Sequence, residues 1–159
     1  KLDAKTVEFK KEKIYADDLI LKAVEPVNML IKDKNQQFIL CGDNPILEID
    51  INWTSEALLN ILKNCCEHTP VGGQLKAEIF DSVMYTEIVI SDNGEGISSK
   101  DLPFIFERFY RASKSSDDSV GIGLAMSYSI LTSQEASVHV RSRLNVGTAF
   151  SIRFYKQVK

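Results

Sequence analysis

The sequence predicts an α+β fold, a two-layer α/β sandwich with helices on one face of a mixed, mainly antiparallel sheet. Segments with the helical spacing of apolar residues are interleaved with segments in which apolar and polar residues alternate, as in strands. The later alternating segments come in pairs separated by short turns, which favours hairpins and therefore antiparallel pairing. Together these two patterns predict helices packed against a sheet that is mixed rather than parallel throughout.

The chain has the length and composition expected of one domain over residues 1–159. Hydrophobic residues make up 44% of the sequence and charged residues 26%, as in an ordinary globular protein. A net charge of −3 provides no basic field for nucleic acid. No apolar run approaches the roughly 20 residues of a membrane span, and no signal peptide is visible. We expect a cytoplasmic domain, and the opening at Lys1 resembles an excised fragment.

The three cysteines, Cys41, Cys65 and Cys66, argue against a disulfide framework because their number is odd and two are adjacent. This usage favours a reducing compartment. A metal site built from cysteine would need a ligand spacing that the sequence lacks.

Strand and helix segments alternate in the first half of the chain. We expect an edge strand at 7–14, a helix over about 19–35, strands within 36–44 and 45–51, and a helix at 53–67. Asp17 or Asp18 is a candidate cap for the first helix, and Pro26 predicts a kink or a break within it. Thr54 or Ser55 is a candidate cap for the second helix, which His68-Thr69-Pro70 should end.

The second half predicts a hairpin, a long connection, a helix and a last strand pair. The segments are 75–82 and 85–92, the connection 93–120, the helix 121–134, and the strands 137–143 and 147–155. Connections of such length are usually functional or mobile. The aromatic residues within it, among them Phe104, Phe106, Phe109 and Tyr110, are either core or functional. His139 lies in an alternating strand and is expected to be structural or exposed.

Asn60 and Asn64 lie four residues apart in the expected helix 53–67 and therefore project from the same face. Amide oxygens suit Mg²⁺, which prefers few protein ligands together with phosphate oxygens. The alternative is two solvent-facing asparagines, which are common in helices.

Asp92 stands at the end of an expected strand and is followed by Asn93-Gly94-Glu95-Gly96. A carboxylate there can accept a hydrogen bond from an exocyclic amine such as adenine N6. The glycines would let the backbone approach a flat ring. The alternative is a simple turn, since Asn-Gly is a strong turn signal.

Gly121-Ile122-Gly123-Leu124 opens the expected helix 121–134. The free N–H groups of a helix start, beside small residues, form a site for an anion such as phosphate. A helix start with two glycines that binds nothing is the alternative.

These three features occur in one chain, and the sequence around them resembles the histidine-kinase branch of the family that also holds type II topoisomerases, heat-shock-90 chaperones and mismatch-repair ATPases. The resemblance covers about residues 50–155. It rests on five blocks, LLNILKNCCEHTPVGG, DNGEGI, FERFYR, GIGLA and NVGTAF, which resemble the N box, the first glycine box, the F box, the second glycine box and the terminal glycine box. The implied architecture is the Bergerat ATP-binding fold.

The resemblance implies a set of residues that contact ATP and Mg²⁺. Asn64 would be the direct metal ligand and Arg111 would approach the terminal phosphate, and these two would act in catalysis. Phe106 and Phe109 would anchor a lid over about residues 95–120. The implied nucleotide-binding residues are Asn60, Asn64, His68, Asp92, Gly94, Gly96, Ile97, Phe109, Gly121, Gly123, Leu124 and Thr148.

Two positions depart from the family pattern. Glu67 stands where many relatives carry a Lys or Arg that helps neutralise phosphate. Ser119-Val120 stands where many have Gly-Thr, which predicts a less flexible lid hinge. Neither change removes the metal ligand or the adenine acceptor, so we expect binding.

The resemblance implies transfer of the γ-phosphoryl group of ATP to a histidine on a separate dimerisation domain, within two-component signalling. His68 and His139 lack the context of a phosphoacceptor, so the acceptor is expected outside this chain. A downstream response regulator is implied, as are a homodimeric parent protein in the bacterial membrane and a monomeric fragment. One alternative is a degenerate nucleotide-binding or interaction module. Another is ATP hydrolysis, which is disfavoured because Asn60 occupies the position of the catalytic glutamate in hydrolysing relatives.

Overall fold

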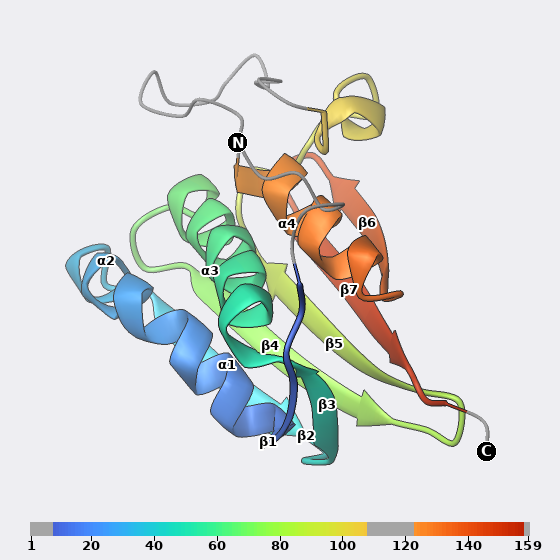
Figure 1. The fold of residues 1–159 in the computed structure, drawn as a ribbon. Coiled ribbons are helices and arrows are strands. Elements are labelled where there is room, and N and C mark those ends of the chain that lie inside the picture. Colours follow the sequence, from blue (N-terminus) through green and yellow to red (C-terminus); the bar gives the residue numbers. More distant parts are fainter. Residues whose placement is uncertain (1–7, 108–122, 158–159) are drawn as a thin grey trace.

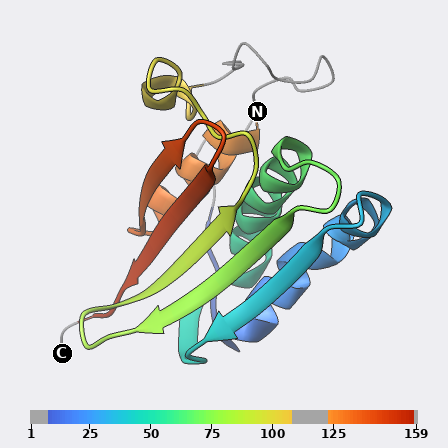
Figure 2. The ribbon, with the colours of Figure 1, turned by 180° about the vertical axis from the view of Figure 1, so that it is seen from behind.

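A computed structural model describes residues 8–107 and 123–157, which form two layers (Figure 1). One layer is a five-stranded sheet in the order β2-β4-β5-β7-β6. Helices α1, α3 and α4 cover one face of it, and the opposite face carries no helix among the described residues (Figure 2). The predicted two-layer sandwich is therefore confirmed.

Antiparallel pairs dominate this sheet. Strand β2 pairs with β4 in parallel, whereas β4 with β5, β5 with β7 and β6 with β7 are antiparallel. The predicted hairpin and the predicted last strand pair are both present. The strands are β2 Gln37–Gly42, β4 Gln74–Asp81, β5 Tyr85–Asp92, β6 Ser137–Arg143 and β7 Gly147–Tyr155.

The first expected strand belongs to a different sheet. Strand β1 (Lys11–Tyr15) pairs antiparallel with β3 (Ile46–Asp50), and these two form a separate ribbon beside the main sheet. Figure 1 shows β1 running along the helical layer rather than along a sheet edge. The prediction of an edge strand is therefore confirmed, but the strand belongs to this two-stranded ribbon and not to the five-stranded sheet.

Pro26 divides the first helical segment, as predicted. Helix α1 spans Ala16–Val24, a 3₁₀ helix spans Glu25–Val27, and α2 spans Asn28–Asp33. The expected cap at Asp17 or Asp18 was wrong, because α1 begins at Ala16 directly after β1, and its N-cap residue Tyr15 makes no side-chain capping bond. The two carboxylates lie in its first turn, where they still interact favourably with the helix dipole.

Helix α3 spans Ile51–His68 and begins before the predicted caps. Asp50, the last residue of β3, is the cap: its Oδ1 accepts the N–H of Trp53 at 2.9 Å. Its Oδ2 accepts the N–H of Lys10 at 2.7 Å, so the same side chain also holds the chain before β1. Thr54 and Ser55, the expected caps, are buried inside the helix instead. The helix ends at His68, as predicted.

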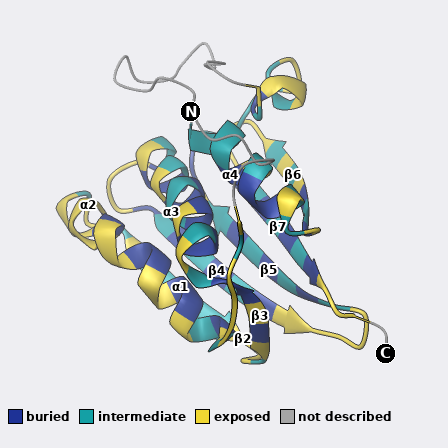
Figure 3. Ribbon diagram, in the orientation of Figure 1, coloured by how far each residue is buried: buried dark blue, intermediate teal, exposed yellow. Residues whose placement is uncertain are grey.

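The core lies between the helices and the sheet (Figure 3). Alternation along the strands directs one side-chain set inward, and the helices α3 and α4 meet that set with their apolar faces. The largest fully buried side chains are Leu19, Ile20, Leu58, Ile61, Leu62, Leu75, Ile79, Ile88, Ile90, Ile130, Leu131 and Phe150.

The ends of several helices and strands lie together at one end of the sandwich. The carboxyl ends of α3 and β5 lie there, together with the first residue of α4 (Gly123–Ser133) and the turn from β6 to β7 (Figure 1). The segment after β5, which contains a 3₁₀ helix at Leu102–Phe104, leaves from the same end. Residues that are far apart in the sequence are thereby brought together.

Candidate functional site

The asparagine pair on α3 faces the start of α4. Asn60 and Asn64 are one turn apart and half-buried. A Cβ added to Gly123 would stand 3.6 Å from both Cβ and Cγ of Asn60 and 3.8 Å from its Oδ1. The predicted metal-ligand helix and the predicted phosphate-binding helix start therefore lie in contact with one another.

Asp92 ends β5 with its side chain directed toward the helices. The alternation places it on the same face as Ile88 and Ile90, both fully buried. Its Oδ1 accepts the backbone N–H of Gly94 at 2.9 Å. Opposite it on β7 stands Thr148, which is buried. This placement agrees with the interpretation of Asp92 as a carboxylate held at a strand end.

Burial raises the pKa of the Asp92 carboxyl above its ordinary value, because removal from water disfavours the charged form. Four groups lower the pKa and so partly offset the burial: the backbone N–H of Gly94, the thiol of Cys65, the backbone of Thr148 and the charge of His68. The carboxyl is thus half-buried but surrounded by donors, an environment that favours a specific acceptor over a solvated surface charge.

Two glycines allow the loop after Asp92 to pack closely. A Cβ on Gly94 would lie 2.2 Å from the carbonyl oxygen of His68. Gly96 has a φ of +75°, and a Cβ there would lie 2.2 Å from the carbonyl oxygen of Arg143. The loop is therefore pressed against the end of α3 on one side and against the β6–β7 turn on the other.

His68 lies at the edge of the site and is held there by Glu95. The ring Nδ1 of His68 is 2.8 Å from Oε1 of Glu95, and the N–H of Glu95 donates to the carbonyl of His68 at 3.1 Å. The structure thus places His68 beside the loop after Asp92 and gives its ring a protein partner. The two residues border an open groove lined by Lys34, Glu67, His68, Thr69, Pro70, Asn93, Gly94, Glu95 and Asn145.

A lysine lies beside the exposed Glu67 at the end of α3. Lys34 Nζ donates to the carbonyl of Cys66 at 2.9 Å and to that of Glu67 at 3.3 Å. This positive charge binds the helix carboxyl end, where the dipole favours it. The Lys34 ammonium group therefore lies near position 67. It comes from the segment after α2, and it is hydrogen-bonded to backbone carbonyl oxygens.

The hydroxyl of Ser142, which the sequence did not single out, connects the predicted site residues Ile97 and Thr148. Ser142 on β6 accepts the N–H of Ile97 at 2.6 Å and lies 2.8 Å from the hydroxyl of Thr148. Ser142 also donates to the carbonyl of Gly147 at 3.0 Å. Because Ser142 belongs to an ordinary alternating strand, no local pattern distinguishes it. Ile97 itself packs against the core.

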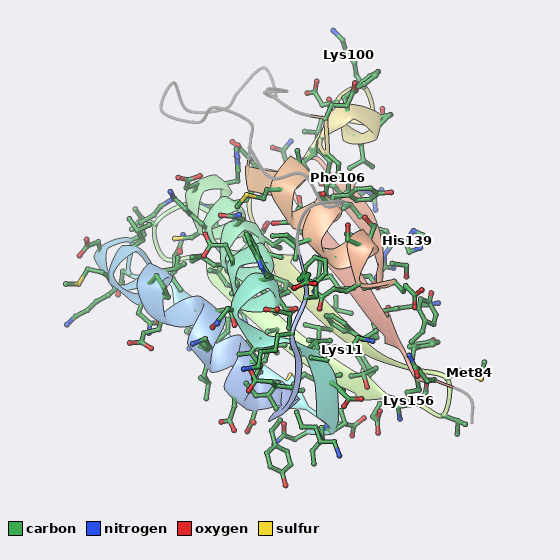
Figure 4. The ribbon with its side chains drawn as sticks, in the orientation of Figure 1. Lys11, Met84, Lys100, Phe106, His139 and Lys156 are labelled. Atoms are coloured by element: carbon green, nitrogen blue, oxygen red, sulfur yellow. The ribbon has the colours of Figure 1, made fainter. Side chains whose placement is uncertain are left out.

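Phe106 packs on the body of the domain, as predicted. Its ring centroid lies 5.0 Å from that of Tyr128 on α4 and 6.4 Å from that of Phe150 on β7. Figure 4 shows it beside α4, whereas Lys100 of the same segment points away from the body. Phe104, by contrast, is 46% exposed, so only part of the aromatic cluster contributes to the core.

The remaining predicted residues divide into two groups. Leu124, next to Gly123 in α4, is partly buried against the core. Phe109, Arg111 and Gly121 lie outside the described residues, as does the second half of the expected lid. In the described ranges no group of three His, Cys, Asp or Glu side chains is placed to hold a metal ion.

The chain matches one family model over residues 49–158, that of the histidine kinase-, DNA gyrase B- and HSP90-like ATPases. This match covers more than half of the chain. It includes the asparagine pair, Asp92, the start of α4 and Thr148.

Sensor kinases are among the curated proteins that resemble it. The chain is 30% identical over 144 residues to the heme sensor protein HssS of Staphylococcus saprophyticus, covering 84% of this chain and 31% of that protein. It is 32% identical over 138 residues to the adaptive-response sensory kinase SasA of Synechococcus elongatus, covering 84% and 36%. The chain therefore spans about a third of the length of these relatives.

Solved structures show the same fold. The mycobacterial sensor histidine kinase MprB superposes with a TM-score of 0.80 at 24% identity, over 92% of this chain and 97% of that one. The nucleotide-free catalytic domain of histidine kinase ThkA gives 0.81 at 21% identity, over 94% and 97%. With the family match and the site geometry, these likenesses lead to one conclusion: the chain belongs to the histidine kinase-, DNA gyrase B- and HSP90-like ATPase family, as an ATP-binding domain of the sensor histidine kinase type.

Proposed function

We propose that this domain binds ATP with Mg²⁺ and donates the γ-phosphoryl group to a histidine on a separate dimerisation domain. The observation that carries the proposal is the meeting of three elements at one end of the sandwich. The Asn60 amide of α3 lies against the start of α4, Asn64 lies one turn further along α3, and the Asp92 carboxyl is at the end of β5. One end thus offers an adenine acceptor, hard neutral ligands and a helix start.

Each element has a separate role in this proposal. Asp92 accepts the adenine N6 amine, with Thr148 and Ile97 at the adjoining wall. Asn64 would hold Mg²⁺ through its amide oxygen, with Asn60 lining the phosphate region, and the cation would neutralise the charge that develops on the phosphates. The N–H groups at the start of α4 bind phosphate oxygens.

Residues 95–120 are proposed to form the lid, with Phe106 and Phe109 as anchors and Arg111 near the terminal phosphate. The domain contributes positioning and electrostatics, and the histidine that attacks in line belongs to another domain. Replacing Arg111 by Ala is then expected to reduce phosphotransfer more than nucleotide binding.

The partners follow from the same proposal. They are the dimerisation domain of the parent kinase and a downstream response regulator, with no nucleic acid. We propose a homodimeric parent in the bacterial membrane with this domain on the cytoplasmic side, and a monomeric fragment. Across residues 8–107 and 123–157, no helix is long and apolar enough to cross a bilayer.

The test is phosphotransfer to a supplied dimerisation domain. Parent protein, Asn64→Ala and a matched control, Asn28→Ala on the distant helix α2, would be incubated with labelled ATP, Mg²⁺ and the acceptor domain. The proposal expects acid-labile label on the acceptor histidine with the parent and the Asn28 variant, and its loss with Asn64→Ala. ATP binding without any transfer would favour the degenerate module instead, a reading supported by Glu67 in place of a basic residue.

A further inference from the structure

Helix α4 lies beside α3, and a fully buried serine of α4 reaches the backbone of α3 (Figure 1). Ser127 Oγ donates to the carbonyl oxygen of Ala57 on α3 at 2.7 Å. It also lies 3.0 Å from the carbonyl oxygen of Gly123, one turn earlier in α4. A hydroxyl has one hydrogen, so the two carbonyls share it, and the shorter distance is the one between the helices. The hydroxyl is therefore bound both to the first turn of α4 and to α3.

Ser127 makes the middle one of three contacts between the two helices. Nearer the proposed site, Gly123 lies against Asn60. Further away, Gln134 Nε2 donates to Thr54 Oγ1 at 2.9 Å. The α3 residues follow in the reverse order of their α4 partners, so the helices run antiparallel. Each hydrogen bond between them opposes sliding of α4 along α3.

The hydroxyl fixes the register of the two helices more closely than apolar packing alone would. Burial of apolar surface is non-directional, whereas a hydrogen bond weakens steeply when its geometry is lost. Ala57 is small and fully buried, and the serine oxygen can therefore reach the α3 backbone directly. Because Ser127 is one turn from Gly123, a shift at Ser127 would move the start of α4 relative to the Asn60 amide.

We propose that Ser127 is a positioning residue, whose hydroxyl holds the start of α4 where its N–H groups can bind phosphate beside Asn60. The inference rests on the proposed function, in which the start of α4 binds phosphate oxygens. It adds that the alignment of this start depends on one buried hydroxyl between the helices. The competing explanation is that the hydroxyl is satisfied within α4 by the carbonyl four residues earlier, as is common for serine in helices.

The experiment compares a ligand that has phosphates with one that has none. Mg²⁺-ATP and adenosine would be titrated into the domain and followed by NMR, which detects binding at millimolar dissociation constants. In Ser127→Ala the affinity for Mg²⁺-ATP should fall about threefold to fivefold, up to the factor that one neutral hydrogen bond contributes. The fall is expected because binding must then also align the start of α4. Adenosine affinity should stay unchanged, because Asp92 lies on β5.

A pair of variants of equal size separates the hydroxyl from the packing at position 127. Ser127→Thr keeps the hydroxyl, whereas Ser127→Val has the same shape without it. Whatever the added methyl group costs, Ser127→Thr should bind Mg²⁺-ATP more tightly than Ser127→Val. Equal affinities in this pair would overturn the inference, and the comparison decides the matter even if Ser127→Ala does not fold.

Thr132 of α4 provides a control for a hydroxyl that is bound within the helix. Its Oγ1 donates to the carbonyl of Tyr128 at 2.7 Å, four residues earlier in α4. Thr132→Val should therefore match the parent in its affinity for Mg²⁺-ATP. Equal losses in Thr132→Val and Ser127→Ala would favour the competing explanation and overturn the inference.

The parent protein and Asn64→Ala separate this inference from the proposed function. If the parent binds Mg²⁺-ATP, Asn64→Ala loses it and Ser127→Ala binds like the parent, only the role of Ser127 is wrong. Equal losses of ATP and adenosine in Ser127→Ala would show a general loosening of the domain and would also overturn the inference. If the folded parent binds no ATP, the proposed function is wrong and the role of Ser127 is overturned with it.

Discussion

The first residue of α4, Gly123, lies against Asn60 of α3, so that a Cβ on Gly123 would stand 3.6 Å from Cβ and Cγ of the asparagine. This separation is ordinary van der Waals contact rather than overlap. The glycine at this position is therefore not needed to avoid a clash with α3. Because glycine has no side chain, nothing at position 123 covers the Asn60 amide.

That relationship predicts the effect of side-chain size at position 123. Gly123→Ala should fold and bind Mg²⁺-ATP like the parent, because one methyl group fits. Gly123→Leu should weaken Mg²⁺-ATP binding about tenfold, since its side chain would crowd the Asn60 amide. Calorimetric titration of both variants checks this. Equal affinity for the Ala and Leu variants would show that the nucleotide does not approach Asn60.

Asp92→Asn should abolish the preference for adenine and leave the fold intact. The amide retains the size of the carboxyl but presents a donor, so it no longer accepts from N6 as a carboxylate does. If this variant bound ATP and GTP as the parent does, Asp92 would not be the adenine acceptor. Asp18→Asn, on the exposed surface of α1, is the matched control and should behave like the parent.

Asp92→Asn should not lower the stability of the domain against unfolding at neutral pH. The pKa of Asp92 is raised in the folded state, so the native protein holds this proton more tightly than the unfolded chain. The contribution of Asp92 to stability is therefore greatest below the unfolded pKa and declines as pH rises through the folded pKa. Thermal unfolding at neutral pH should show Asp92→Asn at least as stable as the parent, and a clear loss of melting temperature would contradict the assigned environment.

Gly94→Ala should destabilise the domain by about 3 kcal/mol, because its Cβ would lie 2.2 Å from the His68 carbonyl oxygen. Gly72→Ala is the control for backbone strain alone. Gly72 has a φ of +82° but open space around its Cβ, so a cost of about 1 kcal/mol is expected. Denaturant unfolding of both variants measures the difference, and equal costs would indicate that the close approach of the loop to α3 is not rigid.

Phe106→Ala should release the segment after β5 from the body. The ring packs on Tyr128 and Phe150, and its removal should cost about 1–3 kcal/mol in unfolding free energy. Amide exchange over residues 98–107 should become faster, while that of β4 and β5 stays unchanged. Phe104→Ala, at a more exposed aromatic position in the same segment, is the comparison and should have a smaller effect. Unchanged exchange in Phe106→Ala would show that the anchor lies elsewhere.

The positions of residues that follow from a local sequence pattern could be predicted from the sequence. The four-residue spacing placed Asn60 and Asn64 on one helix face, and alternation placed Asp92 at a strand end, both as observed. The predicted cap of α3 was wrong because Asp50 belongs to the preceding strand, and the hydroxyl residues Thr54 and Ser55, four and five positions further on, offered a competing signal. A capping side chain followed at once by helix is easily read as part of the strand.

Contacts between distant segments could not be predicted in this way. Glu95 meets His68 across 27 positions, and Ser142 meets Ile97 across 45. Neither Glu95 nor Ser142 differs locally from an ordinary loop or strand residue.

The most direct test of ATP binding at this end of the sandwich is calorimetry of the folded domain with ATP, with and without Mg²⁺. We expect weak, saturable binding that Mg²⁺ strengthens, because the proposed site offers the Asn64 amide as a metal ligand, with Asn60 beside it, while Glu67 adds no positive charge. A millimolar dissociation constant corresponds to only about −4 kcal/mol, so high protein concentration is needed. Heat that saturates in the parent and disappears in Asp92→Asn would agree with the account; no heat at millimolar nucleotide, with the protein shown to be folded, would contradict it.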